Sequence, residues 1–244
     1  MPELQGATLA ATIDGAATAT RRLLAAVSDL TQDDVRRPSL LPGWTVAHVL
    51  AHLVGNADSH MHLLAAARRG EVADQYPGGP AQRQGDIEAR AALPVADLLA
   101  ALDTACRGLE DAWAATPPEV WRRGRARVST GEWRLAELPF RRWREVELHS
   151  VDLGLGYRPG DWPEPYVREE LDRAAADLPD RLAPGTAVRL VADDLGWSRV
   201  APSGAADPVL VAAPARSLLA WLVGRGPGTP ALGPWEGTGP RPPG

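Results

Sequence analysis

The chain has 244 residues, of which 45% are hydrophobic and 23% charged, as is ordinary for a globular protein of one or two domains. Its net charge of −5 argues against nucleic acid as a partner, and no apolar run approaches the roughly 20 residues that span a bilayer. Residues 1–17 lack the basic start and apolar core of a signal peptide. The expected location is therefore the cytoplasm.

Two residue types are scarce in this chain. All 26 basic residues are arginine, which excludes lysine chemistry and, with frequent Ala, Gly and Pro, indicates a GC-rich bacterial genome. Cys106 is the only cysteine, so no intrachain disulfide can form. It lies in a helical pattern, and we interpret it as a packed small hydrophobic residue. A reaction that needs a thiol would therefore require one from outside this chain.

Long helices are predicted for the first part of the chain. Their patterns cover residues 7–30, 45–69, 94–115 and 134–153. Thr45 is a good N-cap for the second pattern, and Gly70 follows as its stop. The polar segment 71–92 is expected to be a loop, and the Gly- and Arg-rich segment 124–133 a connection. Helices of these lengths favour a four-helix bundle.

The pattern changes after Pro159. A helix is expected over residues 164–182, then three short β-branched segments, then a helix that starts near Pro214. The sequence therefore predicts an α-helical bundle over residues 1–158 and a small α/β domain over residues 159–244. The end of the second domain is too rich in Pro and Gly to form a packed element.

Two residue pairs carry the chemistry that the sequence suggests. His48 and His52 are spaced i, i+4, as are Glu145 and His149, so each pair shares one face of its helix. Facing helices of a bundle can direct all these side chains into one pocket. Imidazole nitrogen and carboxylate oxygen are ligands that zinc prefers, and a catalytic site keeps one position open.

Each pair by itself is weak evidence, because a solvent-facing polar stripe would give the same pattern. Their pairing on helices that should be neighbours favours a metal site. Three ligands from His52, Glu145 and His149 would leave a position open, whereas His48 would be a fourth ligand, a neighbour of the ligands or a substrate contact. Asp152 is placed to accept a hydrogen bond from a ligating histidine. His60 and His62, to either side of the stripe, are predicted to lie at the surface.

Three motifs together are similar to a known family. LPGWTVAHVLAHLVGNAD (41–58), RWREVELHSVDLG (142–154) and LLAWLVGR (218–225) resemble, in this order, the mycothiol-dependent maleylpyruvate isomerase family. Its members have a DinB-like four-helix bundle followed by a small α/β domain. The resemblance implies zinc, or another divalent metal, on His52, Glu145 and His149. It also implies mycothiol, a low-molecular-weight thiol of actinobacteria, as the cosubstrate.

The resemblance also implies roles for residues near the metal. The metal would hold the mycothiol sulfur as a thiolate, which adds to the cis double bond of maleylpyruvate; rotation and elimination then give fumarylpyruvate. Arg225 matches an arginine thought to take part in catalysis, and it, or one of Arg141 and Arg142, would hold a carboxylate or the enolate. His48 would move the proton. Asn56 and Arg141 are candidates for binding the cosubstrate.

Three other functions remain open at this point. A mycothiol S-transferase would use the same site on another electrophile, and a non-catalytic metal- or thiol-binding protein would use it for binding alone. Metal-assisted hydrolysis would need a general base, for which His48 is the candidate. The expected partners are a small-molecule substrate and the thiol, with no nucleic acid and no membrane, and the chain would be a monomer or a homodimer.

Overall fold

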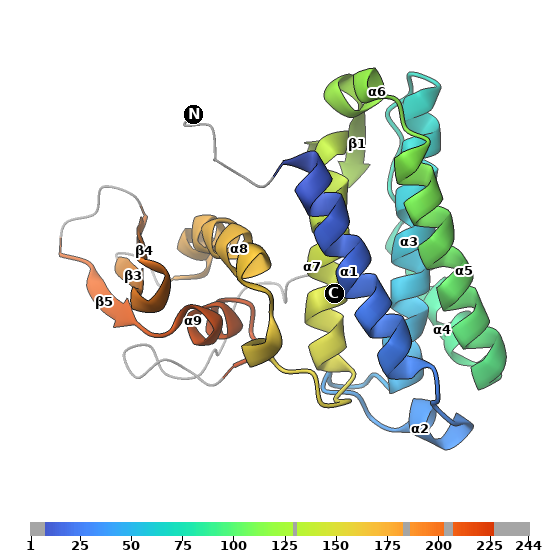
Figure 1. Ribbon diagram of the computed structural model, residues 1–244, viewed down its shortest axis with the longest axis horizontal. Coiled ribbons are helices and arrows are strands. Elements are labelled where there is room, and N and C mark those ends of the chain that lie inside the picture. The colour runs from blue at the N-terminus through green and yellow to red at the C-terminus, as the bar shows by residue number, and fades with distance from the viewer. Residues whose placement is uncertain (1–7, 129–130, 183–185, 203–206, 227–244) are drawn as a thin grey trace. The chain divides into compact units, whose positions relative to one another are not determined.

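The computed structural model describes residues 8–128, 131–182, 186–202 and 207–226, which belong to two compact units. The first unit spans residues 8–155 and is mainly helical. The second begins at Gly156 and combines helices with a small sheet (Figure 1). This agrees with the expected helical domain and smaller α/β domain. The outer limits of the predicted domains, and the Pro- and Gly-rich tail, lie outside the described residues.

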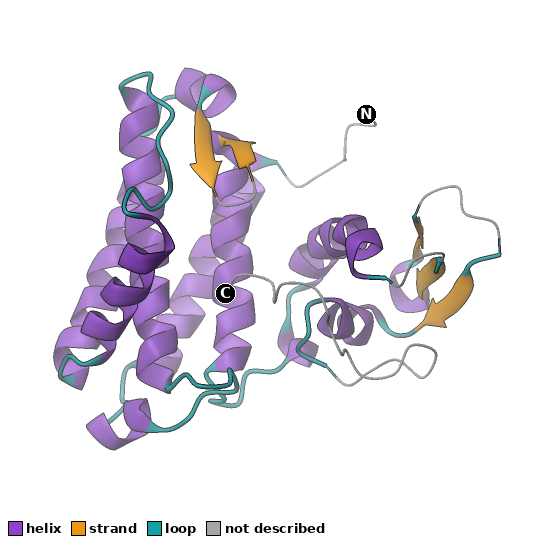
Figure 2. Cartoon of the chain, turned by 180° about the vertical axis from the view of Figure 1, so that it is seen from behind, coloured by secondary structure: helices purple, strands orange, loops and turns teal. Residues whose placement is uncertain are grey.

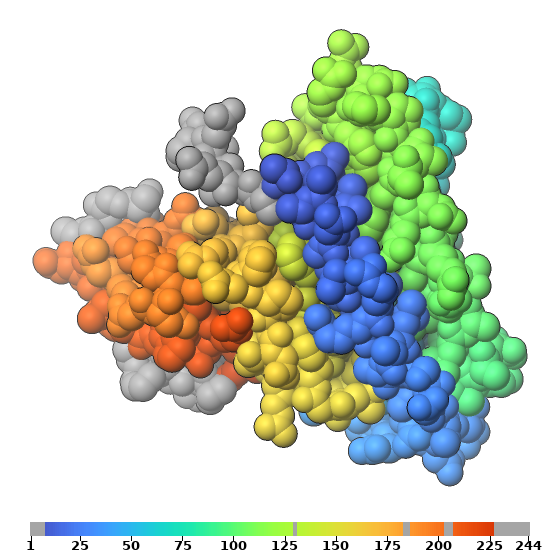
Figure 3. Space-filling model, viewed as in Figure 1, coloured from blue at the N-terminus to red at the C-terminus, as the bar shows by residue number. Residues whose placement is uncertain are grey.

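The helical unit is built around four long helices. Its described helices are α1 (Leu9–Val27), α2 (Gln32–Arg36), α3 (Val46–Arg68), α4 (Gly79–Ala91), α5 (Val95–Ala114), α6 (Pro118–Arg123) and α7 (Leu138–Asp152). Among the long ones, α1 packs on α7, and α3 packs on both α5 and α7. Helix α1 also contacts α5, and the two lie side by side on the face shown in Figure 3.

Helix α3 is covered on most of its circumference, because α4, α5 and α7 all pack on it. It begins as predicted at Thr45, whose side chain accepts a hydrogen bond from the backbone N–H of His48. Leucines fill the contacts of the helical unit at under 2% exposure, and they include Leu50, Leu53, Leu63, Leu64, Leu98, Leu102 and Leu109. A polar side chain on the α7 side of α3 is therefore removed from water.

The predicted loop over residues 71–92 is wrong for its second half, where helix α4 forms. Pro80 lies in its first turn, a position that suits proline because the first helical N–H groups need no partner within the helix. Ile87 is the buried residue of α4, at 2% exposure. One apolar anchor in a polar segment gives no helical periodicity, which is why the sequence pattern failed to predict this helix.

The connection expected over residues 124–133 contains a β-hairpin. Strand β1 (Arg125–Val128) pairs antiparallel with β2 (Gly131–Arg134), and Ala126 lies opposite Trp133. The hairpin lies near α6, at one end of the helical unit (Figure 2). A 3₁₀ turn over Leu135–Glu137 follows, so α7 begins at Leu138 rather than near residue 134.

Helices α1 and α7 meet through a close fit and a buried ion pair. Gly15 of α1 leaves room for the Trp143 ring, since a Cβ at this glycine would lie only 2.5 Å from ring carbons. The fully buried Glu147 accepts hydrogen bonds from Trp143 Nε1 at 2.9 Å and from Arg22 Nη2 at 2.6 Å. These contacts hold the register of α7, from which two of the three candidate ligands project.

The second unit packs two helices with a three-stranded sheet. Its described elements are the 3₁₀ turns Pro159–Asp161, Leu178–Arg181 and Asp193–Leu195, helices α8 (Glu164–Asp177) and α9 (Ala215–Leu222), and strands β3 (Val188–Ala192), β4 (Trp197–Ala201) and β5 (Val209–Ala212). The strand order is β4-β3-β5, with β3 antiparallel to β4 and parallel to β5. Helix α8 packs on α9 and contacts β4, whereas α9 contacts β3.

The predicted helix over residues 164–182 is shorter in the structure, because Pro179 follows Leu178 and the last turn is 3₁₀. Trp162, Tyr166 and Leu190 are fully buried within this unit. Across both units, none of the helices in the described residues is long and apolar enough to span a membrane.

Candidate metal centre

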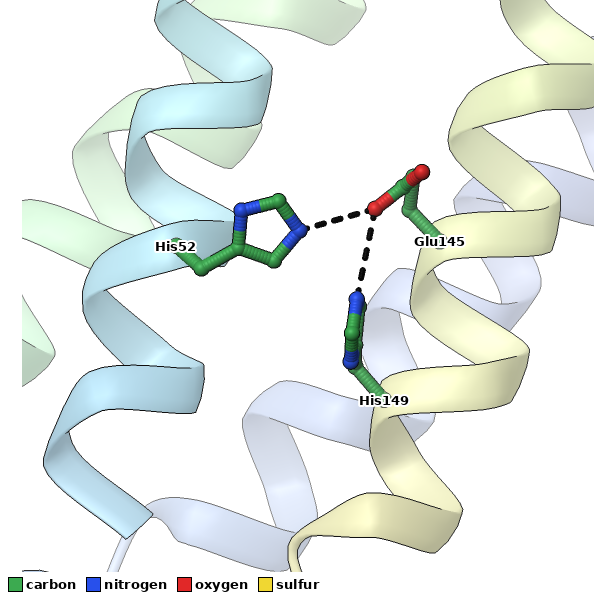
Figure 4. Close-up of side chains that lie close together, drawn as sticks. All are labelled: His52, Glu145 and His149. Atoms are coloured by element: carbon green, nitrogen blue, oxygen red, sulfur yellow. Dashed lines mark hydrogen bonds and ion pairs between the residues drawn. The ribbon is translucent and has the colours of Figure 1, made fainter. Parts of the chain in front are cut away.

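His52 is held in the interior by α3, where its side chain is 2% exposed. Its Nε2 lies 2.8 Å from Glu145 Oε2 of α7 (Figure 4). Its other ring nitrogen, Nδ1, lies 3.1 Å from Arg83 Nη2 of α4. A guanidinium can only donate, so the hydrogen-bond network assigns Nδ1 as the acceptor and places the ring proton on Nε2.

Helix α7 presents Glu145 and His149 on one face, one turn apart. His149 Nε2 lies 3.4 Å from the same carboxylate oxygen, Oε2, that contacts His52 (Figure 4). His149 Nδ1 lies 2.9 Å from Asp152 Oδ2, as expected for the hydrogen bond predicted from the sequence. A carboxylate can only accept when ionised, so His149 donates from Nδ1 and turns Nε2 toward Glu145.

Burial and hydrogen bonding set the protonation of the three side chains in different ways. Burial lowers the pKa of His52 to about 4, so its imidazole is neutral near pH 7. Burial favours the neutral acid of Glu145, but hydrogen bonds from His149 and His52 outweigh it and hold the Glu145 pKa well below its usual value. Burial also disfavours a charged His149, yet hydrogen bonds to Asp152 and Glu145 raise its pKa. Glu145 is therefore the anionic centre of the group.

The donor set fits a divalent metal ion. One atom from each of His52, Glu145 and His149 lies within 4.8 Å of the other two, and both histidines are buried. Two imidazole nitrogens and one carboxylate oxygen are the ligands of many catalytic zinc sites. Asp152, beyond His149, supplies the carboxylate that commonly orients a metal-binding histidine.

His48 is placed outside this group. Its Nδ1 lies 2.7 Å from Thr45 Oγ1, in the capping box that starts α3. Its Nε2 lies 3.2 Å from Glu88 Oε2 of α4. His48 thus joins the beginning of α3 to α4, whereas the group whose atoms converge contains His52 and the two residues of α7. The Trp44 ring centroid lies 5.9 Å from that of His52 and forms a wall beside it.

The candidates for cosubstrate binding have partners of their own. Asn56 is 4% exposed, and its Oδ1 accepts a hydrogen bond from Arg142 Nη1 at 2.8 Å. The guanidinium of Arg141 stacks on the ring of Trp133 in β2. Arg225 belongs to the second unit, just beyond α9, where its Nη1 donates to the carbonyl of Val223 at 2.8 Å. The proposed roles of these residues stay predictions.

Two residues near the site were missed or misplaced by the sequence patterns. Arg83 contacts His52 directly, but it lies in the segment predicted to be a loop. His60, predicted at the surface, is 2% exposed, whereas His62 is exposed as expected. Helix α3 is enclosed by three helices, so a position 80° from the polar stripe is still covered. Pro80 was the sequence signal for the start of α4, because proline suits the first turn of a helix. Recognising this helix would have placed Arg83 on it.

The buried His60 predicts a dependence of stability on pH. Burial, with the charge of Arg142 nearby, lowers the pKa of His60 from 6.5 to about 3. Between these values the unfolded chain binds one more proton than the folded chain, so stability falls as pH falls through this window. The expected slope from His60 is at most ~1.4 kcal/mol per pH unit.

Urea unfolding at pH 7 and pH 5 checks this expectation. His60→Leu removes the titrating group and should lose less unfolding free energy between the two pH values than the wild type does. His52 is present in both proteins, so it contributes equally to the pH dependence of their unfolding free energies. Equal losses in the two proteins would show that His60 is not held neutral by the fold.

The fold and the donor set define a class: helical proteins with a candidate metal centre between two helices, followed by a small α/β unit. The chain belongs to the family described as the mycothiol maleylpyruvate isomerase N-terminal domain, which matches residues 16–154, more than half of the chain. Family membership supports an enzyme that uses mycothiol. No curated protein matches the sequence.

Two solved structures have a similar fold. One is the crystal structure of the mycothiol-dependent maleylpyruvate isomerase, at a TM-score of 0.82 and 24% identity, covering 97% of this chain and 97% of that chain. The other is an H52A mutant of the mycothiol-dependent maleylpyruvate isomerase, at a TM-score of 0.81, with the same identity and coverage. The fold is therefore shared across both units of the chain.

Proposed function

We propose that this protein catalyses the mycothiol-dependent cis-trans isomerisation of maleylpyruvate, or of a close analogue. The observation that carries the proposal is the convergence of His52, Glu145 and His149 within 4.8 Å, in a chain of this family. The chain's own thiol gives no alternative nucleophile, because Cys106 is buried at 3% exposure and lies against Arg142. The reacting thiol is therefore supplied by the cosubstrate.

A divalent metal ion, zinc by the preference of this donor set, would be held by His52, Glu145 and His149. When bound, such an ion favours the thiolate form of a thiol, which is the reactive nucleophile. Asp152 orients His149 for this role through the hydrogen bond from Nδ1. Glu145 contributes a negative charge that offsets part of the charge of the ion.

The proposed reaction conserves atoms and electrons. The thiolate sulfur forms a bond to one carbon of the cis double bond, and the displaced electron pair moves to the conjugated carbonyl oxygen, giving an enolate. The former double bond is now single and rotates. The pair then returns, the carbon–sulfur bond breaks and the thiolate leaves behind the trans product, fumarylpyruvate. The thiol is regenerated, so no oxidant or reductant is needed.

The protein's other residues would stabilise charge and move one proton. In this proposal Arg225 binds a substrate carboxylate or the enolate oxygen, because guanidinium matches carboxylate geometry in a bidentate manner. His48, with Glu88 as its 3.2 Å partner, relays the proton that the thiol releases and later regains. Arg141 and Asn56 remain candidates for contacts to the cosubstrate.

Turnover of maleylpyruvate by purified protein with mycothiol tests the proposal. Product formation and free thiol are measured together, and fumarylpyruvate with no loss of thiol is expected. Stoichiometric loss of thiol would instead show an S-transferase, and binding of metal and thiol without turnover would show a non-catalytic protein. Dialysis against a chelator should remove activity and added zinc should restore it; full activity of metal-free protein would contradict the mechanism.

A further inference from the structure

Arg142 is a fully buried arginine at the contact between the two helices that carry the candidate ligands. It lies on α7 at 1% exposure, three residues before Glu145 and seven before His149. Positions spaced i, i+3 and i+7 share one face of a helix, so Arg142 lies on the same side of α7 as these two ligands. Its guanidinium meets α3, the helix from which His52 projects.

The guanidinium of Arg142 contacts two helices besides its own. Its Nη1 donates to the carbonyl oxygen of Leu53 and to Oδ1 of Asn56, both at 2.8 Å. Leu53 directly follows His52 and Asn56 lies about one turn beyond it, so both acceptors belong to the part of α3 that presents this ligand. The other terminal nitrogen, Nη2, lies 3.4 Å from Cys106 Sγ of α5. Arg142 therefore links α7 to α3 next to the candidate metal centre.

The partners of this buried cation are neutral groups. They are a backbone carbonyl, an amide and a thiol, and within the described part of the chain no carboxylate forms an ion pair with Arg142. A buried charge is costly unless it is paired, and an apolar side chain of similar volume in its place is often neutral or stabilising. The presence of Arg142 here therefore favours a role in geometry over a role in stability.

The separation of α3 and α7 is a sensitive quantity for the candidate metal centre. Helix α7 packs most extensively on α1, and α3 packs most extensively on α5, whereas the contact between α3 and α7 is smaller. Yet this smaller contact brings His52 Nε2 to 2.8 Å from Glu145 Oε2. Ligands of a metal have to be held within about 0.5 Å of their working positions. The planar guanidinium of Arg142 suits this task, because its donors have fixed directions and bridge several acceptors at once.

We propose that Arg142 is a positioning residue for the candidate metal centre. Through the Leu53 carbonyl and the Asn56 amide, it sets the separation of α3 and α7 at which the three candidate ligands converge. This role differs from the substrate contact that the sequence suggested for Arg142, because its guanidinium is enclosed within the helical unit. The inference rests on the metal-binding part of the proposed function and is independent of the isomerase reaction.

Titration of the metal-free full chain with cobalt(II) tests this role, because the visible absorption of bound cobalt reports its coordination geometry. In Arg142→Met, which removes the guanidinium but fills most of its volume, we expect the cobalt dissociation constant to rise about 10-fold and the absorption bands to shift. Arg142→Lys keeps the charge without the fixed fork and should lie between this variant and the wild type. Arg22→Met is the matched control, because Arg22 also bonds to a buried residue of α7, Glu147, but links that helix to α1. The control should keep the wild-type affinity and spectrum, even where its free energy of unfolding is lower.

The outcomes separate this inference from the proposed function. Wild-type cobalt affinity with an unchanged spectrum in the Arg142 variants would overturn the positioning role, as would an equal loss of affinity in Arg22→Met. If Arg142→Met does not fold, Arg142→Lys decides by the same two measurements against the same control. A wild type that binds cobalt in the way that depends on Arg142, yet does not turn over maleylpyruvate, would support the positioning role and refute the isomerase.

Discussion

Replacing His52 by alanine is expected to reduce bound metal from about one ion per chain to near zero, and turnover by a factor on the order of 10³. His52 is the only ligand candidate from α3, so its loss leaves Glu145 and His149, two donors from a single turn of α7. Two donors hold a divalent ion far less tightly than three, since a structural or catalytic site in proteins uses three or four.

Elemental analysis of purified protein, with turnover measured on the same sample, checks this result. His48→Ala and His62→Ala are the matched controls for metal content, because both remove a histidine from α3 that lies outside the converging group. Both controls should keep their metal. A loss of metal in His48→Ala equal to that in His52→Ala would make His48 a fourth ligand, contrary to its bonds with Thr45 and Glu88.

Asp152→Asn and Asp152→Ala are expected to weaken metal binding by about 10-fold and up to about 100-fold, respectively. Asp152 Oδ2 lies 2.9 Å from His149 Nδ1, and both side chains are buried. The asparagine keeps an oxygen that can accept this hydrogen bond but loses the negative charge, which makes the imidazole a weaker donor to a metal. Alanine loses the hydrogen bond as well, so the His149 ring is no longer oriented.

Competition with a chromogenic chelator measures the two dissociation constants. The order of the effects is the informative result: wild type binds most tightly, then the asparagine variant, then the alanine variant. Asp58→Asn, which changes the same residue type on α3 without touching His149, should leave metal affinity near that of the wild type. Equal affinity of all Asp152 variants would show that His149 is oriented by helix packing alone.

The sequence patterns correctly predicted the helices in which apolar residues recur at clear helical spacing. Thr45 and Gly70 bracket α3 closely, and the long helices α1, α5 and α7 lie within the expected segments. Helix α4 was not predicted, because a helix held by Ile87 alone shows no periodicity. The β1–β2 hairpin was missed for a related reason: each strand is only four residues long, and its pairing depends on contact with α6 and the chain around it.

The sequence by itself determined that His48 with His52, and Glu145 with His149, share helix faces, since i, i+4 spacing follows from 3.6 residues per turn. The three motifs also indicated the family. The match of the family model to residues 16–154 confirms it. Only the tertiary structure decided which side chains meet. The packing of α3 on α7 brings His52 close to Glu145 and His149. His48 instead contacts Thr45, the N-cap of α3, and Glu88 of α4.

The same division holds for the surroundings of the site. A sequence shows that Asp152 follows His149 by three residues, which suffices for a hydrogen bond within one helical turn. It cannot show that Arg83 reaches Nδ1 of His52, or that His60 is enclosed, because both depend on where α4 and α5 pack. Contacts within one helix are fixed by its period, whereas contacts between helices depend on how all their side chains pack together.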